Sequence, residues 1–104
     1  MIFVSMVIEA QESSIERLTS AMAGMMAETR SEAGCLTYTY SRDLEVENRF
    51  HLCEIWETSE LMEAHIDAAH SVRFVAILNE LAQIRAVKAF GGDVEKVRIR
   101  APAS

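Results

Sequence analysis

The sequence is poor in the residues that interrupt or cross-link a chain. Its 104 residues include one proline, four glycines, two cysteines and one tryptophan. This composition excludes collagen-like and low-complexity segments. The only proline, Pro102, lies near the C-terminal end, so no internal segment has the composition of an interdomain linker. We therefore expect one domain over residues 1–104, with residues 91–104 as a C-terminal extension or arm.

Positive charge is also scarce. Lys and Arg number 10 against 16 Asp and Glu, which gives a net charge of −6. Proteins that bind nucleic acids concentrate positive charge on one surface. The only basic cluster, Lys96–Arg100, alternates with apolar residues, as one solvent-exposed strand face does. We therefore expect no nucleic-acid partner.

Long apolar runs are missing as well. No segment approaches the ~20 apolar residues of a membrane-spanning helix. The apolar N-terminal segment 2–8 lacks the basic region and cleavage site of a signal peptide. Cys35 and Cys53 have neither metal-binding nor redox spacing. We therefore expect a cytoplasmic protein with no membrane partner and with both thiols reduced and in the core.

The hydrophobic pattern predicts strands and helices in alternation. Runs of β-branched and aromatic residues predict strands at 2–9, 35–42, 49–57 and 84–90. Apolar residues three and four apart predict helices that begin at serine or threonine caps and span about 13–34, 59–68 and 71–83. The polar segment 43–48 predicts a hairpin loop, and 94–100 a final strand or arm. This order predicts an α+β fold, the ferredoxin-like split β-α-β sandwich.

The first predicted strand is apolar on both faces. Val4 and Met6 lie on one face, whereas Phe3 and Val7 lie on the other. An antiparallel sheet with one solvated face would alternate between apolar and polar residues. The predicted helices can cover only one face, so we expect a second copy of the chain to cover the other. The result would be a homodimer with sheet-to-sheet packing, a dimeric α+β barrel.

Candidate chemical groups are found on the second and third predicted strands. Glu54 and Trp56 lie two residues apart, so they share one strand face. Either Trp56 anchors the core and Glu54 bonds a neighbour, or both face a cavity. In a cavity the indole would hold a flat substrate, and a buried carboxyl group with a raised pKa would move a proton. His51 lies on the opposite face and is expected to be structural. Tyr38 either offers its phenol or packs across the sheet.

Two histidines, His65 and His70, lie five residues apart in the helical region. Paired metal ligands on one helix are four residues apart, as in H-E-x-x-H. At 100° per residue, a separation of five turns the two rings about 140° apart. No cysteine or carboxylate completes a recognisable ligand set, so the sequence predicts no metal site. A structural role is the alternative for each histidine.

Residues 34–74 resemble the antibiotic biosynthesis monooxygenase domain family. The motifs are Gly34–Cys35 before a strand, Glu54-x-Trp56, and Leu61-x-x-x-His65 followed by His70. The resemblance extends over nearly the whole chain. It implies a ferredoxin-like fold that dimerises through packed sheets. It also implies an oxygenase that oxidises quinol-like or polycyclic phenolic molecules with O₂ and uses no cofactor, whether flavin, haem or metal.

The resemblance also implies roles for individual residues. The expected catalytic groups, which orient the substrate or move its proton, are Glu54, His65 and His70. Residues expected to bind a small aromatic substrate are Trp56, Phe50, Tyr38 and Arg73.

Two other functions are compatible with the same sequence. Similar folds include an isomerase of a phosphorylated autoinducer sugar, which shares the two-histidine pattern. Arg73 would then be the nearest candidate for binding phosphate. The other alternative is a ligand-binding dimer without catalytic activity. Haem-degrading proteins of similar fold have an additional pocket tryptophan where this chain has His65, which argues against haem.

Overall fold

The computed structural model describes residues 1–95 and 97–99. Its strands are β1 (Ile2–Ala10), β2 (Cys35–Arg42), β3 (Arg49–Trp56) and β4 (Ala82–Gly91). Its helices are α1 (Ile15–Thr29), α2 (Ser59–Asp67) and α3 (Ala69–Leu81), with a 3₁₀ turn at Glu12–Ser14 before α1. The strands form one antiparallel sheet in the order β2-β3-β1-β4. The predicted α+β ferredoxin-like fold is confirmed.

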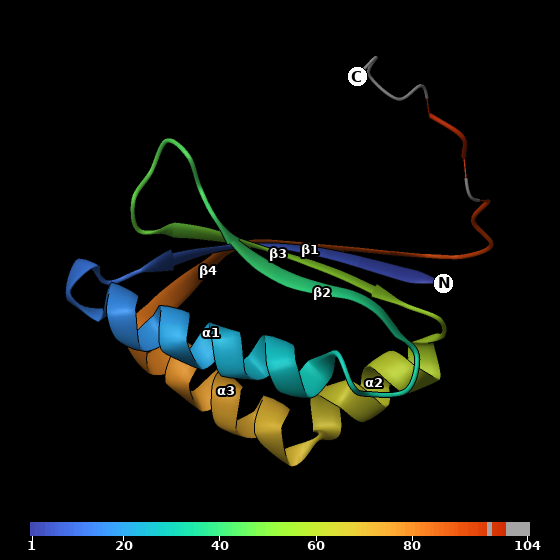
Figure 1. The fold of residues 1–104 in the computed structure, drawn as a ribbon, viewed down its shortest axis with the longest axis horizontal. Helices are drawn as coiled ribbons and strands as arrows, with labels where there is room; N and C mark the ends of the chain where they lie inside the picture. The colour runs from blue at the N-terminus through green and yellow to red at the C-terminus, as the bar shows by residue number, and fades with distance from the viewer. Residues whose placement is uncertain (96, 100–104) are drawn as a thin grey trace.

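All three helices lie on one side of the sheet (Figure 1). The core fills the space between the two layers with large apolar side chains from both: Ile8, Phe50, Leu52 and Trp56 from the sheet, and Leu18, Met22, Phe74 and Leu78 from α1 and α3. Burying one such side chain contributes about 1.5–3 kcal/mol relative to leaving it in water. The core therefore fixes the helices against one face of the sheet.

Helix α1 has the predicted apolar stripe, with Leu18, Met22 and Met25 buried. It ends at Thr29, earlier than predicted, and Gly34 lies in the turn that follows, at a φ of 79°. Ser14 occupies the N-cap position, but its side chain makes no capping hydrogen bond. The helix therefore depends on packing of its apolar face rather than on a serine cap.

Helices α2 and α3 are separated by a sharp break in the backbone. Thr58 caps α2 as predicted, since its side chain accepts a hydrogen bond of 3.2 Å from the backbone N–H of Leu61. At Ala68 the backbone becomes extended, with ψ at 145°, and α3 begins at the next residue. Helix α3 thus starts two residues earlier than predicted and ends at Leu81, where β4 begins. The break lies between the two candidate histidines.

The opposite face of the sheet is not covered by any described helix (Figure 1). The register places Phe3 of β1 between Ile55 of β3 and Phe90 of β4 in one row across this face. The Phe90 side chain is 67% exposed. Cys53 lies on the same face and is exposed, so the prediction that both cysteines lie in the core was wrong for this residue. Within one chain, no described helix lies on that side to bury it.

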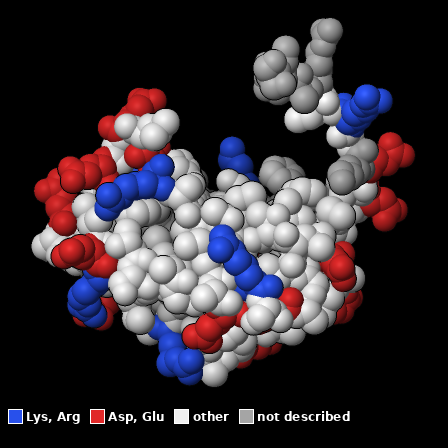
Figure 2. Space-filling model, viewed as in Figure 1, with Lys and Arg blue, Asp and Glu red and all other residues white. Residues whose placement is uncertain are grey.

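The charged side chains do not gather into a basic surface on the face seen in Figure 2, where the blue side chains are separated from one another. Beyond β4, the described residues 92–95 and 97–99 contain no helix or strand. Residues 96 and 100–104 of the predicted extension, including part of the basic cluster, lie outside the described residues. Within the described part of the chain, no helix is long and apolar enough to cross a membrane.

We expect Gly34→Ala to destabilise the fold. A Cβ atom at this position would lie 2.9 Å from Leu61 Cβ, and a φ of 79° is disfavoured for alanine. The free energy of unfolding should fall by about 2 kcal/mol or more, measured by urea or thermal denaturation.

Gly24→Ala is the matched control. Gly24 lies within α1, and a Cβ atom there would have no neighbour within 4 Å. Alanine should therefore raise the free energy of unfolding by about 0.5–1 kcal/mol. Equal effects of the two substitutions would contradict this account of Gly34.

Candidate active site

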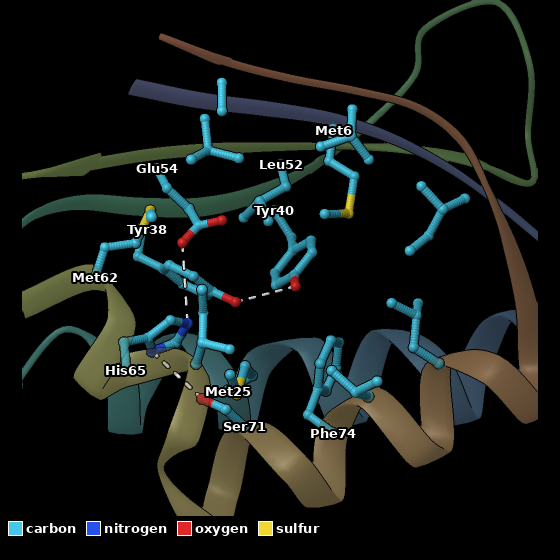
Figure 3. Close-up of a pocket in the computed structure, with 17 residues that line it drawn as sticks. Met6, Met25, Tyr38, Tyr40, Leu52, Glu54, Met62, His65, Ser71 and Phe74 are labelled. Carbon is cyan, nitrogen blue, oxygen red and sulfur yellow. Dashed lines mark hydrogen bonds and ion pairs between the residues drawn. The ribbon is translucent and has the colours of Figure 1, made fainter. Parts of the chain in front are cut away.

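A cavity of about 320 Å³ lies between the inner face of the sheet and the helices (Figure 3). Most of its lining is apolar and comes from both layers: Val4, Met6, Leu52, Ile84, Val87 and Ala89 from the sheet, and Met25, Met62, Ile66, Phe74, Val75 and Leu78 from the helices. The polar lining residues are Tyr38, Tyr40, Glu54, His65 and Ser71. An apolar hollow with a few converging polar groups is typical of a small-molecule site.

Glu54 enters the cavity from β3 and is only 7% exposed. The indole Nε1 of Trp56 donates a 3.0 Å hydrogen bond to Glu54 Oε1. Burial raises the pKa of Glu54 because the ionised form loses its hydration. The bond from Trp56 and the nearby His65 act in the opposite direction but do not cancel the effect of burial. The site therefore favours the protonated form of Glu54 more than water does.

His65 faces Glu54 from α2 (Figure 3). Its Nδ1 donates a 2.7 Å hydrogen bond to Glu32 Oε2, and its Nε2 lies 3.9 Å from Glu54 Oε1. Because Glu32 holds the proton on Nδ1, the neutral ring presents the lone pair of Nε2 toward Glu54 and the cavity. The Trp56 ring packs against the imidazole, with centroids 4.8 Å apart. His65 is therefore oriented as a proton acceptor.

Two phenol groups complete the polar side of the cavity. The hydroxyl oxygens of Tyr38 and Tyr40 lie 3.0 Å apart and share a hydrogen bond (Figure 3). Burial raises the pKa of both phenols well above the ordinary value, so both keep their protons. One hydroxyl donates to the other, which leaves one hydroxyl hydrogen for an acceptor in the cavity.

The structure brings some predicted site residues to the cavity and places others elsewhere. Glu54, His65 and Tyr38 line it. Trp56 does not: it is fully buried and contacts Glu54 and His65 instead, which corresponds to the alternative of a core anchor. Phe50 faces a different hollow, on the side of α1, because it lies four residues before Glu54 along β3.

His70 and Arg73 line a smaller hollow of about 140 Å³ between α1 and α3. Neither belongs to the lining of the larger cavity. Both lie on α3, and Phe74 is the residue of that helix which turns toward Tyr40, at 5.6 Å between ring centroids. The predicted contact of Arg73 with a substrate therefore stays a prediction, without support from the lining of the larger cavity.

His65 and His70 do not point apart. The 140° separation applies to two residues of one continuous helix, whereas the break at Ala68 places them on two helices with ring centroids 6.1 Å apart. Glu32 joins them, since its Oε2 lies 3.4 Å from His70 Nε2 and also accepts the bond from His65. Glu32 lies in the turn after α1, where no periodic pattern marks it. Sequence reasoning also missed Ser71, because it treated this residue only as the cap of a helix.

These features define a small α+β domain with a partly open, mostly apolar cavity that has the lining of a small-molecule site. The family model for antibiotic biosynthesis monooxygenase matches residues 1–77. The chain belongs to this family, as its motifs predicted.

Solved structures of similar fold support this assignment. A protein from Bacteroides thetaiotaomicron, named as a possible oxidoreductase, is 27% identical, with a TM-score of 0.81 over 86% of this chain and 94% of its own. A protein from Deinococcus radiodurans, provisionally named as an antibiotic biosynthesis monooxygenase, is 21% identical, with a TM-score of 0.87 over 97% and 100%. A Mycobacterium tuberculosis protein is 19% identical, with a TM-score of 0.82 over 92% and 98%. The last two show similarity of fold alone. No curated protein sequence matches the chain.

We expect Glu54→Gln to flatten the dependence of stability on pH. A carboxyl group whose pKa is raised on folding destabilises the folded state once it is ionised. This loss begins as the pH rises above the unfolded value, about 4.5, and is complete above the raised pKa. The melting temperature of the variant minus that of the native chain should therefore grow across this range and then level off, in thermal unfolding from pH 4 to 8.

Glu57→Gln serves as the control, because it removes the same charge from an exposed side chain just beyond β3. Its melting temperature should differ from the native value by a similar amount at every pH. A constant difference for Glu54→Gln would mean that burial does not govern this carboxyl group.

Proposed function

We propose that this protein is an oxygenase that oxidises a small phenolic or quinol-like aromatic molecule with O₂ and needs no bound cofactor. The observation that carries the proposal is the lining of the cavity. It combines an oriented imidazole and a buried carboxyl group with apolar walls, and contains no Lys or Arg among its lining residues. A neutral aromatic ring and O₂ are both compatible with such walls, whereas an anionic substrate would find no cation there.

His65 is the proposed base. Its Nε2 takes the proton of a substrate hydroxyl, and the imidazolium that forms is stabilised by Glu32, 2.7 Å from Nδ1. The phenolate is electron-rich and reduces O₂ directly. For a quinol, one oxygen atom enters the ring and the other leaves as water, while the substrate is oxidised to a hydroxyquinone and supplies all the electrons. The apolar walls would reduce the contact of the intermediate with water on the covered side of the cavity.

Glu54 and the tyrosine pair position the substrate. The raised pKa of Glu54 favours a carboxylic acid that donates a hydrogen bond to a substrate oxygen. The free hydroxyl hydrogen of Tyr38 or Tyr40 offers a second donor on the same side of the cavity. Two donors beside one base would select a ring with oxygen substituents.

The alternative of a phosphorylated-sugar isomerase receives less support. A phosphate group in the cavity would need a cation, and Arg73 lies on a separate hollow. A purely ligand-binding role would not require the lone pair of His65 to face the cavity. The measurement of O₂ uptake described below distinguishes the oxygenase from both alternatives.

We also propose that the protein works as a homodimer joined through the uncovered face of the sheet. Phe3, Ile55 and Phe90 form an apolar row across this face. Exposed apolar patches of this kind mark interaction sites on soluble proteins. A second copy would cover the face with its own identical row, as a two-fold interface requires.

We expect the native chain to consume O₂ when it is given a hydroquinone or an anthrone, and His65→Gln to lower kcat/KM by about 10²–10⁴-fold. Uptake is measured with an oxygen electrode, and product by absorbance. The control is His51→Gln, because this imidazole lies on the other sheet face, bound to Asp43. Exchange of substrate hydrogen for deuterium without O₂ uptake would support the isomerase instead, and binding without either would support a ligand-binding dimer.

We expect light scattering after size exclusion to give the mass of a dimer, and Phe90→Glu to give that of a monomer. The substitution places a charge in the apolar row, where its desolvation would cost several kcal/mol. Val72→Glu is the control, since Val72 is 60% exposed on α3, away from the proposed interface. A native chain that runs as a monomer at micromolar concentration would contradict the dimer.

A further inference from the structure

We propose that Glu32, His65 and His70 form a binding site for a divalent transition metal ion of the zinc class. One ligand atom from each residue lies within 4.8 Å of the others. The three residues come from the turn after α1, from α2 and from α3, so only the folded chain brings them together. Two imidazoles and one carboxylate are ligands that zinc accepts in open sites, where water fills the fourth position.

Two of the three separations between the ligand atoms are close to the distances of a tetrahedral site, and the third is within 4.8 Å. Ligand atoms at about 2.0–2.1 Å from a tetrahedral ion lie about 3.4 Å from one another. His70 Nε2 is already 3.4 Å from Glu32 Oε2. His65 Nδ1 is 2.7 Å from the same oxygen, because a proton is shared between them. The metal ion would replace that proton, and this pair would open by about 0.7 Å.

An independent observation comes from His70. Its Nε2 is shielded from solvent and has no hydrogen-bond partner among the described residues, although Glu32 lies near it. Buried polar atoms in native proteins are nearly always hydrogen-bonded, since an unpaired one costs about 1–3 kcal/mol. A metal ion bound to Nε2 would remove this cost. The buried Nε2 of His70 is therefore a candidate ligand atom for an ion held beside Glu32.

The outer nitrogen of each ring faces a further carboxylate. His70 Nδ1 lies 3.5 Å from Glu28 Oε2, and His65 Nε2 lies 3.9 Å from Glu54 Oε1. Histidines that bind metals usually present their second ring nitrogen to a carboxylate or carbonyl, which fixes the ring and makes it a better ligand. Ser71 Oγ, 3.4 Å from His65 Nδ1, offers a polar neighbour for water at the fourth position.

The ligand set also indicates which ions would bind. Imidazole ligands suit Zn²⁺, Co²⁺, Ni²⁺ and Cu²⁺, whereas Mg²⁺ and Ca²⁺ prefer sites made of oxygen atoms. Two of the three ligands here are imidazoles. The site should therefore bind Zn²⁺ and Co²⁺ and should discriminate against Mg²⁺.

Metal binding would change what His65 can do in the cavity. A neutral imidazole with a metal ion on Nδ1 carries its proton on Nε2, so it has no lone pair for a substrate proton. Occupancy of the site would therefore suppress the proposed oxidation. This consequence rests on the proposed function, whereas the binding of the metal does not.

The test titrates the full chain with Co²⁺, followed by visible absorption, and with Zn²⁺, followed by calorimetry. We expect one ion per chain, with the strong visible bands of four-coordinate Co²⁺. Glu32→Gln and His70→Gln should each weaken binding at least 10-fold. His51→Gln is the matched control, since it removes an imidazole that also contacts a carboxylate, on the other sheet face. Its binding should equal that of the native chain.

Three results would overturn the site: no saturable binding to the native chain, equal binding by Glu32→Gln and His70→Gln, or equal loss in His51→Gln. Circular dichroism of each variant establishes that it is folded, and two independent ligand substitutions guard against failure of one. Binding without any O₂ uptake by the metal-free chain would support the site and reject the proposed function. Uptake without metal binding would do the reverse. Uptake that falls as Zn²⁺ saturates the native chain would support both.

Discussion

The hydrogen bond between His65 and Glu32 is the interaction on which the site depends. It joins α2 to the turn after α1 and fixes which nitrogen of His65 carries the proton. Without it, the imidazole could turn its N–H toward the cavity and could not act as the proposed base. Because His65 is almost completely buried, the partner carboxylate also stabilises the ring when it becomes charged.

The two faces of the sheet carry different kinds of side chain and make different contacts. The inner face carries Leu52 and Trp56 into the core and Glu54 into the cavity. A buried carboxyl group with a raised pKa lowers the stability of the fold at neutral pH. The atoms that line an apolar cavity also lose packing contacts. Functional sites commonly retain such unfavourable features because removing them would remove the chemistry. Among the described residues, the outer face has no buried carboxyl group beside a buried histidine. Its apolar row is instead suited to contact with another chain.

Much of the fold was predictable from local pattern. Strands β2 and β3, their hairpin loop and the apolar stripe of α1 lie where alternation and helical spacing place them. Glu54 and His65 were also found, because a strand face and an apolar helix edge both have a period that can be counted. Arg73 and Trp56 were expected to contact a substrate, but neither is in the lining of the cavity. A strand or helix face can be read from spacing, whereas the neighbour that covers it depends on how the layers pack.

The sequence by itself determined the element types, the α+β order and the family, since these depend on periodicity, caps and motifs within short segments. Only the tertiary structure decided that His65 and His70 meet at Glu32. The extended backbone at Ala68 redirects α3, and the turn after α1 supplies a carboxylate that lies 33 residues before His65 in the chain. This contact cannot be inferred from the spacing of residues along the chain, because it forms only when three separate segments pack against one sheet.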